Sequence, residues 1–440
     1  MMFSLHGVHV PHRKGTAGKP AVKMTPPARV VLPMAMHIGR PAEVCVQVGD
    51  AVCVGTMIGA AAGPVSSPVF SSVSGKVVGV QDFLLASGAT TKAVVIESDG
   101  AMTVDGSVAP PAVTSRESLL AALASSGIVG LGGAGFPTHV KLNVPAEKIE
   151  YLVINGAECE PYVTSDTRTM LTRGEDMAVA LTALAAHLGV RRAVIGIEAN
   201  KPRAIAAMRA LAEDLSETLT LTVQVLPAIY PQGGEKVLIY RTTGRVVPNG
   251  KLPIDVGCVV LNCTTLAAIG AYLQTGMPLV EKCVTVDGGA VKEPQNVLVP
   301  LGSAMADVIA FCGGYTVPAH KLLYGGPMMG ITVPDDTAPI LKNTNAVLAL
   351  TAREVKTPRT TACIRCGSCA SSCPFGLVPL QIAAATERRD VTMLGDLAVM
   401  NCMECGCCSF VCPAHRPLVQ TNKLAKTILR EAQAKEGKGK

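Results

Sequence analysis

The sequence predicts a multidomain α/β protein with an N-terminal all-β module, a central α/β domain, a second β-rich segment and a C-terminal metal-binding domain. Its length of 440 residues corresponds to about three domains, each large enough to bury a core. A composition of 49% hydrophobic and 16% charged residues excludes a disordered chain. Nine of the 16 cysteines lie between residues 363 and 412, which indicates a metal centre rather than a role in the core.

Charge and hydropathy exclude several function classes. The mean hydropathy of +0.37 is high, but Gly, Pro or charged residues interrupt every apolar stretch before about 18 residues, so we expect no transmembrane segment. The N-terminus, MMFSLHGVHVPHRK, lacks the apolar core and cleavage site of a signal peptide, and a cytoplasmic protein is expected. A net charge of +6 is modest and does not predict a nucleic-acid partner.

The chain begins with an arm, residues 1–28, which we expect to pack on the module that follows it. Metal binding by three histidines of the arm is the alternative: His6, His9 and His12. Residues 29–105 contain short Val- and Gly-rich β runs separated by turn residues. They resemble the barrel-sandwich hybrid of biotinyl and lipoyl carrier domains. Carrier function is not expected, because no lysine lies in a Met-Lys-Met hairpin, and we interpret the module as structural.

A new domain, residues 115–250, starts after a Pro-rich linker. Ser115 is expected to cap a helix over 118–127. From there strands alternate with helices, which predicts a largely parallel sheet. The expected strands lie at 151–158, 193–200 and 220–228, and the expected helices at 176–189 and 201–217.

Residues 251–330 return to short strands with one helix. This segment resembles a soluble-ligand-binding β-grasp (SLBB-like) domain, and a spacer between its neighbours is an equally open interpretation. The last domain is expected at 340–425, with a helix over 377–390, followed by a basic tail at 426–440. We expect the basic residues of this end to be solvated, with docking on an anionic membrane surface or an acidic partner as the alternative. They are Lys423, Lys426, Arg430, Lys435, Lys438 and Lys440.

The cysteines of the last domain form two runs of the pattern C-x2-C-x2-C-x3-C-P. In such runs three thiolates bind one [4Fe–4S] cluster and the fourth ligates the other cluster. The spacing therefore predicts one cluster on Cys363, Cys366, Cys369 and Cys412, and a second on Cys402, Cys405, Cys408 and Cys373. Cys407 is left over. Zinc is the alternative, but it requires two pairs per site and does not explain the third cysteine and the Cys-Pro of each run.

A Gly-rich loop opens the α/β domain, from Gly130 to Thr138. Its small residues expose successive backbone N–H groups, which can form a phosphate-binding nest. A flexible turn is the alternative, and the spacing is not that of the dinucleotide fingerprint G-x-G-x-x-G.

The stretches VGLGGAGFPTHVKL and NGAECEP resemble the flavin-binding motifs of the NADH-oxidising subunit of respiratory complex I and its hydrogenase relatives. The resemblance implies that FMN is bound by Gly130, Gly132, Gly133 and Lys141, that Asn155 and Glu158 line the flavin, and that Phe136 and Glu160 face NAD. Further flavin motifs are implied at Tyr230, Gly233 and Glu235, and at Asn262 and Thr265. Two positions depart from that family: Ala157 replaces an aspartate and Gly234 the first of two glutamates, which weakens the implied dinucleotide contacts.

The order of the segments is similar to that of the C-subunit family of the Rnf ion-translocating ferredoxin:NAD oxidoreductase over essentially the whole chain. The resemblance implies a flavin and iron–sulfur oxidoreductase subunit that exchanges a hydride with NAD(H) at FMN and passes single electrons through two [4Fe–4S] clusters. It also implies a peripheral position on the cytoplasmic face of the bacterial cell membrane. The implied partners are the membrane subunits of the complex and its ferredoxin-type B subunit, and ion movement is placed elsewhere.

Two other functions remain open at this point. One is a soluble cobalamin reductase of the propanediol-utilisation type, although in that group the chain begins close to the Gly-rich loop. The other is an electron-wiring subunit that has lost dinucleotide binding.

Overall fold

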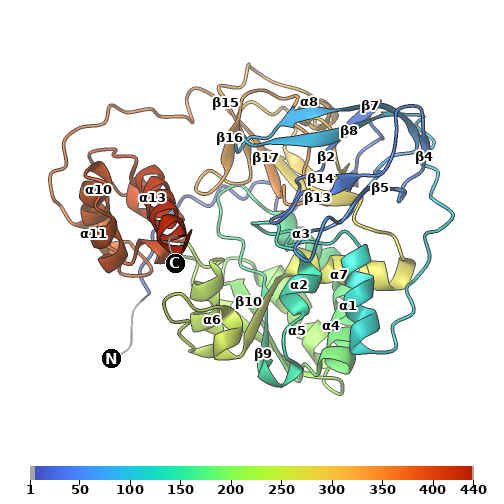
Figure 1. Ribbon diagram of the computed structural model, residues 1–440, viewed down its shortest axis with the longest axis horizontal. Coiled ribbons are helices and arrows are strands. Elements are labelled where there is room, and N and C mark those ends of the chain that lie inside the picture. The colour runs from blue at the N-terminus through green and yellow to red at the C-terminus, as the bar shows by residue number, and fades with distance from the viewer. Residues whose placement is uncertain (1–4, 439–440) are drawn as a thin grey trace.

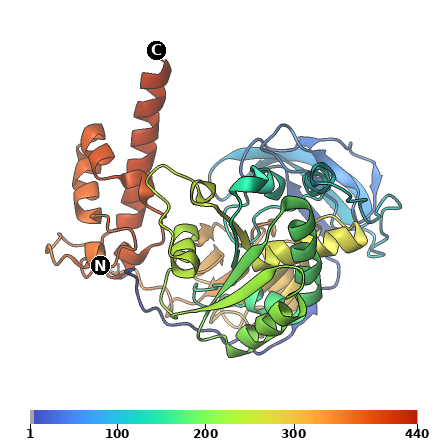
Figure 2. The same cartoon turned by 90° about the horizontal axis from the view of Figure 1, so that it is seen from below.

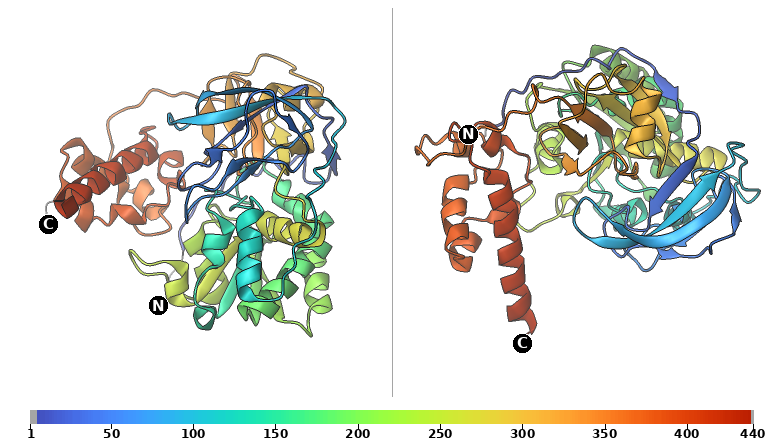
Figure 3. Two further views of the ribbon diagram at one scale, coloured as in Figure 1. Left: turned by 45° about the vertical axis from the view of Figure 1, so that its right-hand side comes forward. Right: turned by 90° about the horizontal axis from the view of Figure 1, so that it is seen from above.

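The computed structural model describes residues 5–438. Two β-rich domains lie together on one side of the α/β domain, and a separate helical module lies beside them at the end of a long linker (Figures 1 and 3). Most buried apolar side chains of the first three domains form one continuous core, whereas the helical module has two cores of its own and shares a small third cluster with the body. No helix among the described residues has the length and apolar character needed to cross a membrane.

The N-terminal module is all β, as predicted, and consists of two small sheets. One has the strand order β2-β8-β7-β4 and the other β3-β5-β6. Val30, Leu32 and Ile96 are fully buried between the sheets, on alternate positions of their strands. The strands are β2 (Arg29–Pro33), β3 (Glu43–Val44), β4 (Ala51–Val52), β5 (Met57–Ala60), β6 (Val69–Phe70), β7 (Gly75–Leu84) and β8 (Thr90–Ser98).

The α/β domain contains a four-stranded sheet of order β11-β10-β9-β12, in which every pair is parallel, as predicted. The strands are β9 (Tyr151–Asn155), β10 (Arg192–Glu198), β11 (Thr220–Leu226) and β12 (Cys258–Asn262). The strand order reverses between β9 and β12, and such switch points are where parallel sheets bind ligands, beyond the carboxyl ends of the strands. Asn155 and Asn262 end these two strands and are paired in register.

Helices cover both faces of this sheet. One face packs on α6, through Leu238 and Ile239, and the other on α3, α4, α5 and α7. Ser115 caps α1 as expected, and the Ser118 side chain completes the capping box. The helices are α1 (Arg116–Ser125), α2 (Thr138–Leu142), α3 (Ser165–Thr172), α4 (Gly174–Leu188), α5 (Pro202–Asp214), α6 (Glu235–Thr243) and α7 (Cys263–Thr275), with 3-10 turns at Ala146–Lys148 and Pro253–Val256.

The β-grasp domain is a six-stranded sheet of order β1-β14-β13-β17-β15-β16. Its elements are β1 (Ala21–Lys23), β13 (Glu281–Asp287), β14 (Gln295–Pro300), α8 (Met305–Phe311), β15 (Lys321–Tyr324), β16 (Ile331–Val333) and β17 (Ala346–Leu350). Its limits differ from the expected 251–330. Residues 258–275 form β12 and α7 of the α/β domain, because β12 pairs with β9, and residues 346–350, expected in the last domain, form a central strand here.

The expectation that the N-terminal arm packs on the barrel module is wrong. The arm runs along the α/β domain, where Val8 and Tyr230 exchange two backbone hydrogen bonds, and then adds β1 to the β-grasp sheet. The reason is that most of its backbone partners lie there: β1 pairs in parallel with β14 from Ala21 to Lys23, and only the end of the arm bonds to the barrel module, where the Ala28 carbonyl accepts from the Ser98 amide.

The C-terminal module consists of short helices around the two cysteine runs and the long helix α13, which projects from the body (Figure 2). The helices are α9 (Ser368–Ser371), α10 (Pro379–Glu387), α11 (Val391–Asp396), α12 (Cys407–Phe410) and α13 (Leu418–Lys438), with a 3-10 turn at Val399–Asn401. The expected solvation is wrong for Lys426, which is buried and donates to Glu404 at 2.5 Å and to the carbonyl of Cys402 at 3.0 Å. Of the other basic residues, Lys440 and the side chain of Lys438 lie outside the described part of the chain.

Lys342, just before β17, is completely buried where three domains meet. Its amine donates to the Ser67 hydroxyl (3.1 Å) and the Pro68 carbonyl (2.6 Å) of the barrel module, and to the Gly127 carbonyl (2.7 Å) of the α/β domain. Burial lowers the pKa of Lys342 to about 7. The cost of enclosing the amine is offset only while both the barrel module and the α/β domain supply acceptors.

A pH dependence of stability follows. Above pH 7 the folded chain holds Lys342 neutral, with its two N–H groups on the Pro68 and Gly127 carbonyls and the Ser67 hydroxyl donating to it. The unfolded chain keeps this lysine protonated to about pH 10, so it makes the free energy of unfolding rise with pH. We expect the parent protein to gain about 1.4 kcal/mol per pH unit relative to Lys342→Met between pH 8 and 9. Denaturant unfolding of both proteins at each pH measures this difference. The exposed Lys356→Met variant is the control and should follow the parent; equal pH slopes for Lys342→Met and the parent would contradict the expectation.

Candidate functional site

A cavity of about 720 Å³ lies at the switch point of the α/β sheet, beyond the ends of β9 and β12. All of the residues that the flavin and dinucleotide motifs implied line it. They are Gly130, Gly132, Gly133, Phe136, Lys141, Asn155, Glu158, Glu160, Tyr230, Gly233, Glu235, Asn262 and Thr265. The parallel sheet brings them together because each motif follows, or closes over, the carboxyl end of a strand.

The Gly-rich loop is held in a closed turn. The amide of Gly130 donates to the Phe136 carbonyl at 2.9 Å, and the amide of Gly135, whose φ is +72°, donates back to Gly130 at 3.2 Å. Gly132 packs directly on the Asn262 side chain, where a Cβ atom would overlap the amide group. The loop therefore needs glycine at position 132 to approach the end of β12.

Two side chains fix the loop from behind. The Thr265 hydroxyl accepts from the Leu131 amide at 2.9 Å, and the amine of Lys282, a completely enclosed side chain of β13, donates to the Leu131 carbonyl. Burial lowers the pKa of Lys282 to about 7. Both main-chain polar groups of Leu131 are thus occupied, and the loop around it is fixed in space.

Asn262 connects the loop to the start of two helices. Its side-chain oxygen caps α7 by accepting from the amides of Thr264 (2.9 Å) and Thr265 (3.2 Å). Its side-chain nitrogen donates to the Asp166 carboxylate at 2.8 Å, and the Thr264 hydroxyl donates to the same carboxylate at 2.6 Å. Asp166 itself lines the cavity.

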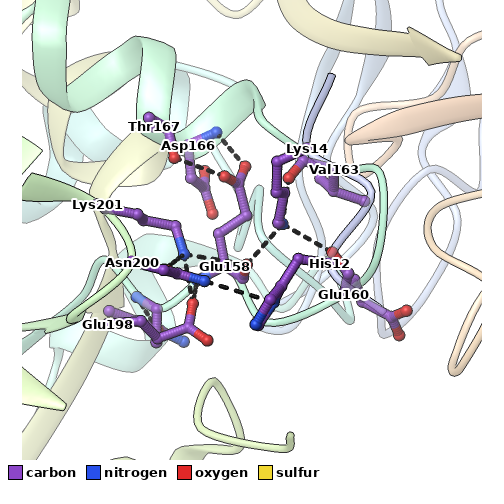
Figure 4. Close-up of polar contacts among 12 residues, drawn as sticks. His12, Lys14, Glu158, Glu160, Val163, Asp166, Thr167, Glu198, Asn200 and Lys201 are labelled. Carbon is purple, nitrogen blue, oxygen red and sulfur yellow. Dashed lines mark hydrogen bonds and ion pairs between the residues drawn. The ribbon is translucent and has the colours of Figure 1, made fainter. Parts of the chain in front are cut away.

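The second loop, residues 155–163, directs its two acidic side chains away from each other. The Glu158 carboxylate accepts from the Asp166 amide and the Thr167 hydroxyl, both at 2.7 Å, at the first turn of α3 (Figure 4). Burial raises the pKa of Glu158 to about 7. The Glu160 carboxylate accepts from the amides of Met328 (3.0 Å) and Met329 (2.7 Å), and burial raises its pKa to about 6. Both residues line the cavity, and their carboxylates hold its walls.

The third loop, residues 230–235, joins the cavity to the helical module. The Asn155 amide group donates to the Gly233 carbonyl at 2.9 Å, and Lys141 forms an ion pair with Glu235 at 2.8 Å inside the cavity. The phenol of Tyr230 points the other way and donates to the carbonyl of Cys405 at 2.7 Å. Tyr230 therefore bonds directly to the second cysteine run.

Gly234, one of the two departures from the complex I motif, packs against Met403. A Cβ atom at position 234 would overlap the terminal methyl group of Met403. Met403 lies between Cys402 and Cys405 and lines both the large cavity and the small cavity of the second cysteine run. The absence of a side chain at Gly234 therefore leaves room for Met403, through which the helical module contacts the cavity.

The cysteines of the two runs gather in two groups. Cys363, Cys366, Cys369 and Cys412 line one small cavity, and the remaining cysteines, Cys373, Cys402, Cys405, Cys407 and Cys408, line the other. The last cysteine of each run thus joins the other run, which is the crossed grouping that the spacing predicts. Cys407 lines the second cavity too, and its thiol packs near the Tyr230 carbonyl at 4.0 Å. Within residues 5–438, no three His, Cys, Asp or Glu side chains meet closely enough to hold a single metal ion.

The residues present fit the cofactors that the motifs imply. Four thiols around one cavity are the donor set of a [4Fe–4S] cluster. The large cavity has the volume of a small-molecule site and is largely apolar with a few polar groups, as flavin sites require. Thr138 lines this cavity, and its buried hydroxyl has no hydrogen-bond partner among the described residues, as expected beside a site that binds a polar ligand.

Four protein-family models match the chain. They are described as the RnfC barrel sandwich hybrid domain (residues 3–101), the Nuo51 FMN-binding domain (123–271), the SLBB domain (283–332) and the 4Fe-4S dicluster domain (362–415). Together they identify FMN and two [4Fe–4S] clusters as the cofactors of these domains.

Curated proteins match over most of the chain. The C subunit of the Na(+)-translocating ferredoxin:NAD(+) oxidoreductase complex of Acetobacterium woodii is 41% identical over 438 residues, covering 98% of both chains. The C subunit of the proton-translocating ferredoxin:NAD(+) oxidoreductase complex of Clostridium ljungdahlii is 40% identical over 389 residues, covering 87% of this chain and 84% of its own. A solved NAD+-reducing [NiFe]-hydrogenase chain is 19% identical with a TM-score of 0.49; the match covers 71% of this chain and 61% of the hydrogenase chain.

The sequence motifs missed three residues that shape the site. Asp166 follows the second motif closely, and the polar start of α3 at Ser165–Asp166 was a signal for it. Lys282 lies in an ordinary β pattern, and Met403 occupies a variable position of a cysteine run, so neither carried a signal. Their roles depend on contacts between domains, which local sequence does not encode.

The crossed cysteine groups predict a specific pattern of cluster loss. Cys363→Ser is expected to remove the cluster of its own run and leave the other, while Cys373→Ser, from the same run, is expected to affect the cluster of the second run. Iron and sulfide analysis should show a loss of about half in each variant. EPR of the reduced proteins should show which cluster remains, and the same remaining signal in both variants would contradict the crossed grouping.

Proposed function

The chain belongs to the family of C subunits of ion-translocating ferredoxin:NAD(+) oxidoreductase complexes, and from this premise we propose that its cavity binds FMN beside NAD(H) and that its cysteine groups carry electrons between this cavity and a ferredoxin-type partner. The observation that supports this most is the position of Met403, which lines both the cavity and the second cysteine group. In this proposal, the cavity that accepts two electrons from NADH lies next to a cysteine group whose cluster carries one electron at a time.

We assign the residues of the cavity to its two ligands. The Gly-rich loop and Lys141 are proposed to hold the FMN phosphate and ribityl groups, with Asn155, Glu158, Asn262 and Thr265 around the flavin. Phe136 and Glu160 are proposed to lie on the dinucleotide side. FMN supplies the exchange of a hydride with NAD(H) and the release of electrons one at a time.

The two cysteine groups are proposed to act in a fixed order. The group of Cys402 adjoins the cavity through Met403 and Tyr230. The group of Cys363 is on the other side of the module, where Cys366 is exposed and the neighbouring Ile364 is 67% exposed. Electrons are therefore proposed to pass between the cavity and the second group first, and to leave or enter the chain at the first.

The partners follow from the family. We propose that the chain lies peripherally on the cytoplasmic face of the cell membrane and contacts membrane subunits and a ferredoxin-type B subunit of its complex. The two relatives named above translocate different ions at nearly equal identity to this chain. We therefore place the choice of ion in other subunits. The cobalamin reductase alternative is not favoured, because the match to the C subunits includes the barrel module ahead of the flavin domain.

NADH is expected to reduce the full chain, reconstituted with FMN, iron and sulfide. Anaerobic addition of NADH at micromolar to millimolar concentration, the usual range of KM, should bleach the flavin absorbance and then the cluster absorbance. Dithionite serves as the control, since it reduces both cofactors without a dinucleotide site. Bleaching by dithionite and none by NADH would refute dinucleotide binding and favour the electron-wiring alternative.

The proposed order of the cysteine groups gives a second expectation. Cys363→Ser retains the group beside the cavity, so NADH should still reduce its remaining cluster at a rate close to that of the parent. Cys402→Ser loses that group, and its remaining cluster should be reduced at least about 100-fold more slowly, given the sensitivity of such steps to small displacements. Freeze-quench EPR after mixing with NADH compares the two variants, and equal rates would contradict the order.

A further inference from the structure

Lys14 lies on the N-terminal arm, far in sequence from every motif of the cavity, yet its amine reaches the second loop (Figure 4). It donates to the carbonyl oxygens of Glu158 and Glu160, both at 2.7 Å, and to that of Val163. Three bonds use the full donor capacity of an ammonium group. One side chain thus binds the main chain at three points of a six-residue segment.

This segment, residues 158–163, forms one wall of the cavity. Glu158, Glu160 and Val163 all line it. The side chains of Glu158 and Glu160 are held apart from each other, Glu158 by the first turn of α3 and Glu160 by the amides of Met328 and Met329. Lys14 supplies the matching restraint on the main chain, so the wall is fixed before any ligand arrives, which lowers the entropy cost of binding.

The amine of a second lysine, Lys201, lies near that of Lys14 but has different hydrogen-bond partners. Lys201 donates to the carboxylate of Glu198 at 2.5 Å and to the Glu158 carbonyl at 3.3 Å. Glu198 thus compensates Lys201 directly, whereas the hydrogen bonds of Lys14 go to main-chain carbonyls (Figure 4). Lys14 is therefore placed to hold the backbone of the loop rather than to neutralise a carboxylate through an ion pair.

The arm that carries Lys14 is itself fixed on both sides. Before Lys14, Val8 exchanges hydrogen bonds of 2.8 and 3.0 Å with Tyr230, and the His12 carbonyl accepts from the Tyr162 amide at 3.0 Å. After it, the Thr16 and Thr164 hydroxyls bond at 2.6 Å. The backbone that carries the Lys14 side chain is therefore held on both sides of this residue. The same arm also bonds to the third loop, at Tyr230.

We propose that Lys14 is a positioning residue of the dinucleotide site, which sets the main chain of residues 158–163 in the conformation that NAD(H) binds. This inference rests on the proposed function, in which NAD(H) enters the cavity beside FMN. It predicts that the arm contributes to dinucleotide affinity without touching the dinucleotide.

The test compares the parent with three variants of the full, cofactor-loaded chain. Lys14→Met keeps most of the length of the side chain and removes its donors, whereas Lys14→Arg keeps a cation with donors. Lys19→Met is the matched control, because Lys19 is an exposed lysine of the same arm whose amine donates to the Pro294 carbonyl at 2.6 Å, away from the loop. The measurements are amide hydrogen exchange over residues 156–164, KM and kcat for NADH with ferricyanide as acceptor, and thermal midpoint.

In Lys14→Met we expect exchange in the loop to accelerate about 10-fold or more, as for the loss of one charge-assisted hydrogen bond. KM for NADH should rise by about the same factor, with kcat changing less than about threefold. The loop exchange rate and KM of Lys14→Arg should lie closer to the parent values, and those of Lys19→Met should equal them.

The inference is wrong if loop exchange and KM of Lys14→Met stay within about twofold of the parent. It is also wrong if Lys19→Met reproduces the effect, or if exchange accelerates throughout the α/β domain and Lys14→Arg restores nothing, since either result indicates general destabilisation. A parent chain that does not oxidise NADH refutes the proposed function instead. In that case the positioning role of Lys14 is tested by the hydrogen exchange of the loop and by FMN affinity. Unchanged loop exchange in Lys14→Met still overturns that role.

Discussion

Lysine amines that donate to main-chain carbonyl oxygens join the α/β domain of this protein to its neighbours. Lys14 comes from the arm, Lys282 from the β-grasp domain and Lys342 from the segment before β17, and each reaches carbonyls of the α/β domain. An enclosed amine costs free energy unless several dipoles replace its water, so each lysine requires its acceptor loop in one conformation. The walls of the cavity therefore depend on segments that lie outside the α/β domain.

The junction between the cavity and the helical module depends on side-chain size. Met403 packs against Gly234, and the Tyr230 phenol donates to the main-chain carbonyl of Cys405 in the second cysteine group. The helical module has cores of its own and a long linker, and it meets the body through these contacts and through an apolar cluster in which Cys405 and Cys407 pack with Val8, Val10 and Met328. The departure from the complex I motif at position 234 thus has a local physical explanation in the presence of a different iron–sulfur module.

Much of the fold and of the candidate site could be predicted from sequence, because the relevant signals are local. Alternating strand and helix patterns predict a parallel sheet, and parallel strands bring their carboxyl ends, with Asn155 and Asn262, to one edge. Cysteine spacing predicts the crossed groups in the same way. Strand β12 was misassigned because a long excursion separates it from β11 and its partner β9 precedes both. The pairing of β1 with β14 and the contacts of the buried lysines join residues that are distant in sequence, and no periodicity marks them.

The parallel pairing of β1 with β14 has a consequence for biosynthesis. Ala21 is paired with Asn296, and Lys19 bonds to Pro294, across 275 residues of sequence. At ribosomal speeds of about 5 to 20 residues per second, the first segment to emerge has no strand to join for roughly 15 to 60 seconds. The strand at the end of the arm is therefore seated late, after the α/β domain has been made, whereas Val8 and Lys14 have their partners in that domain, at Tyr230 and residues 158–163, before β14 is synthesised.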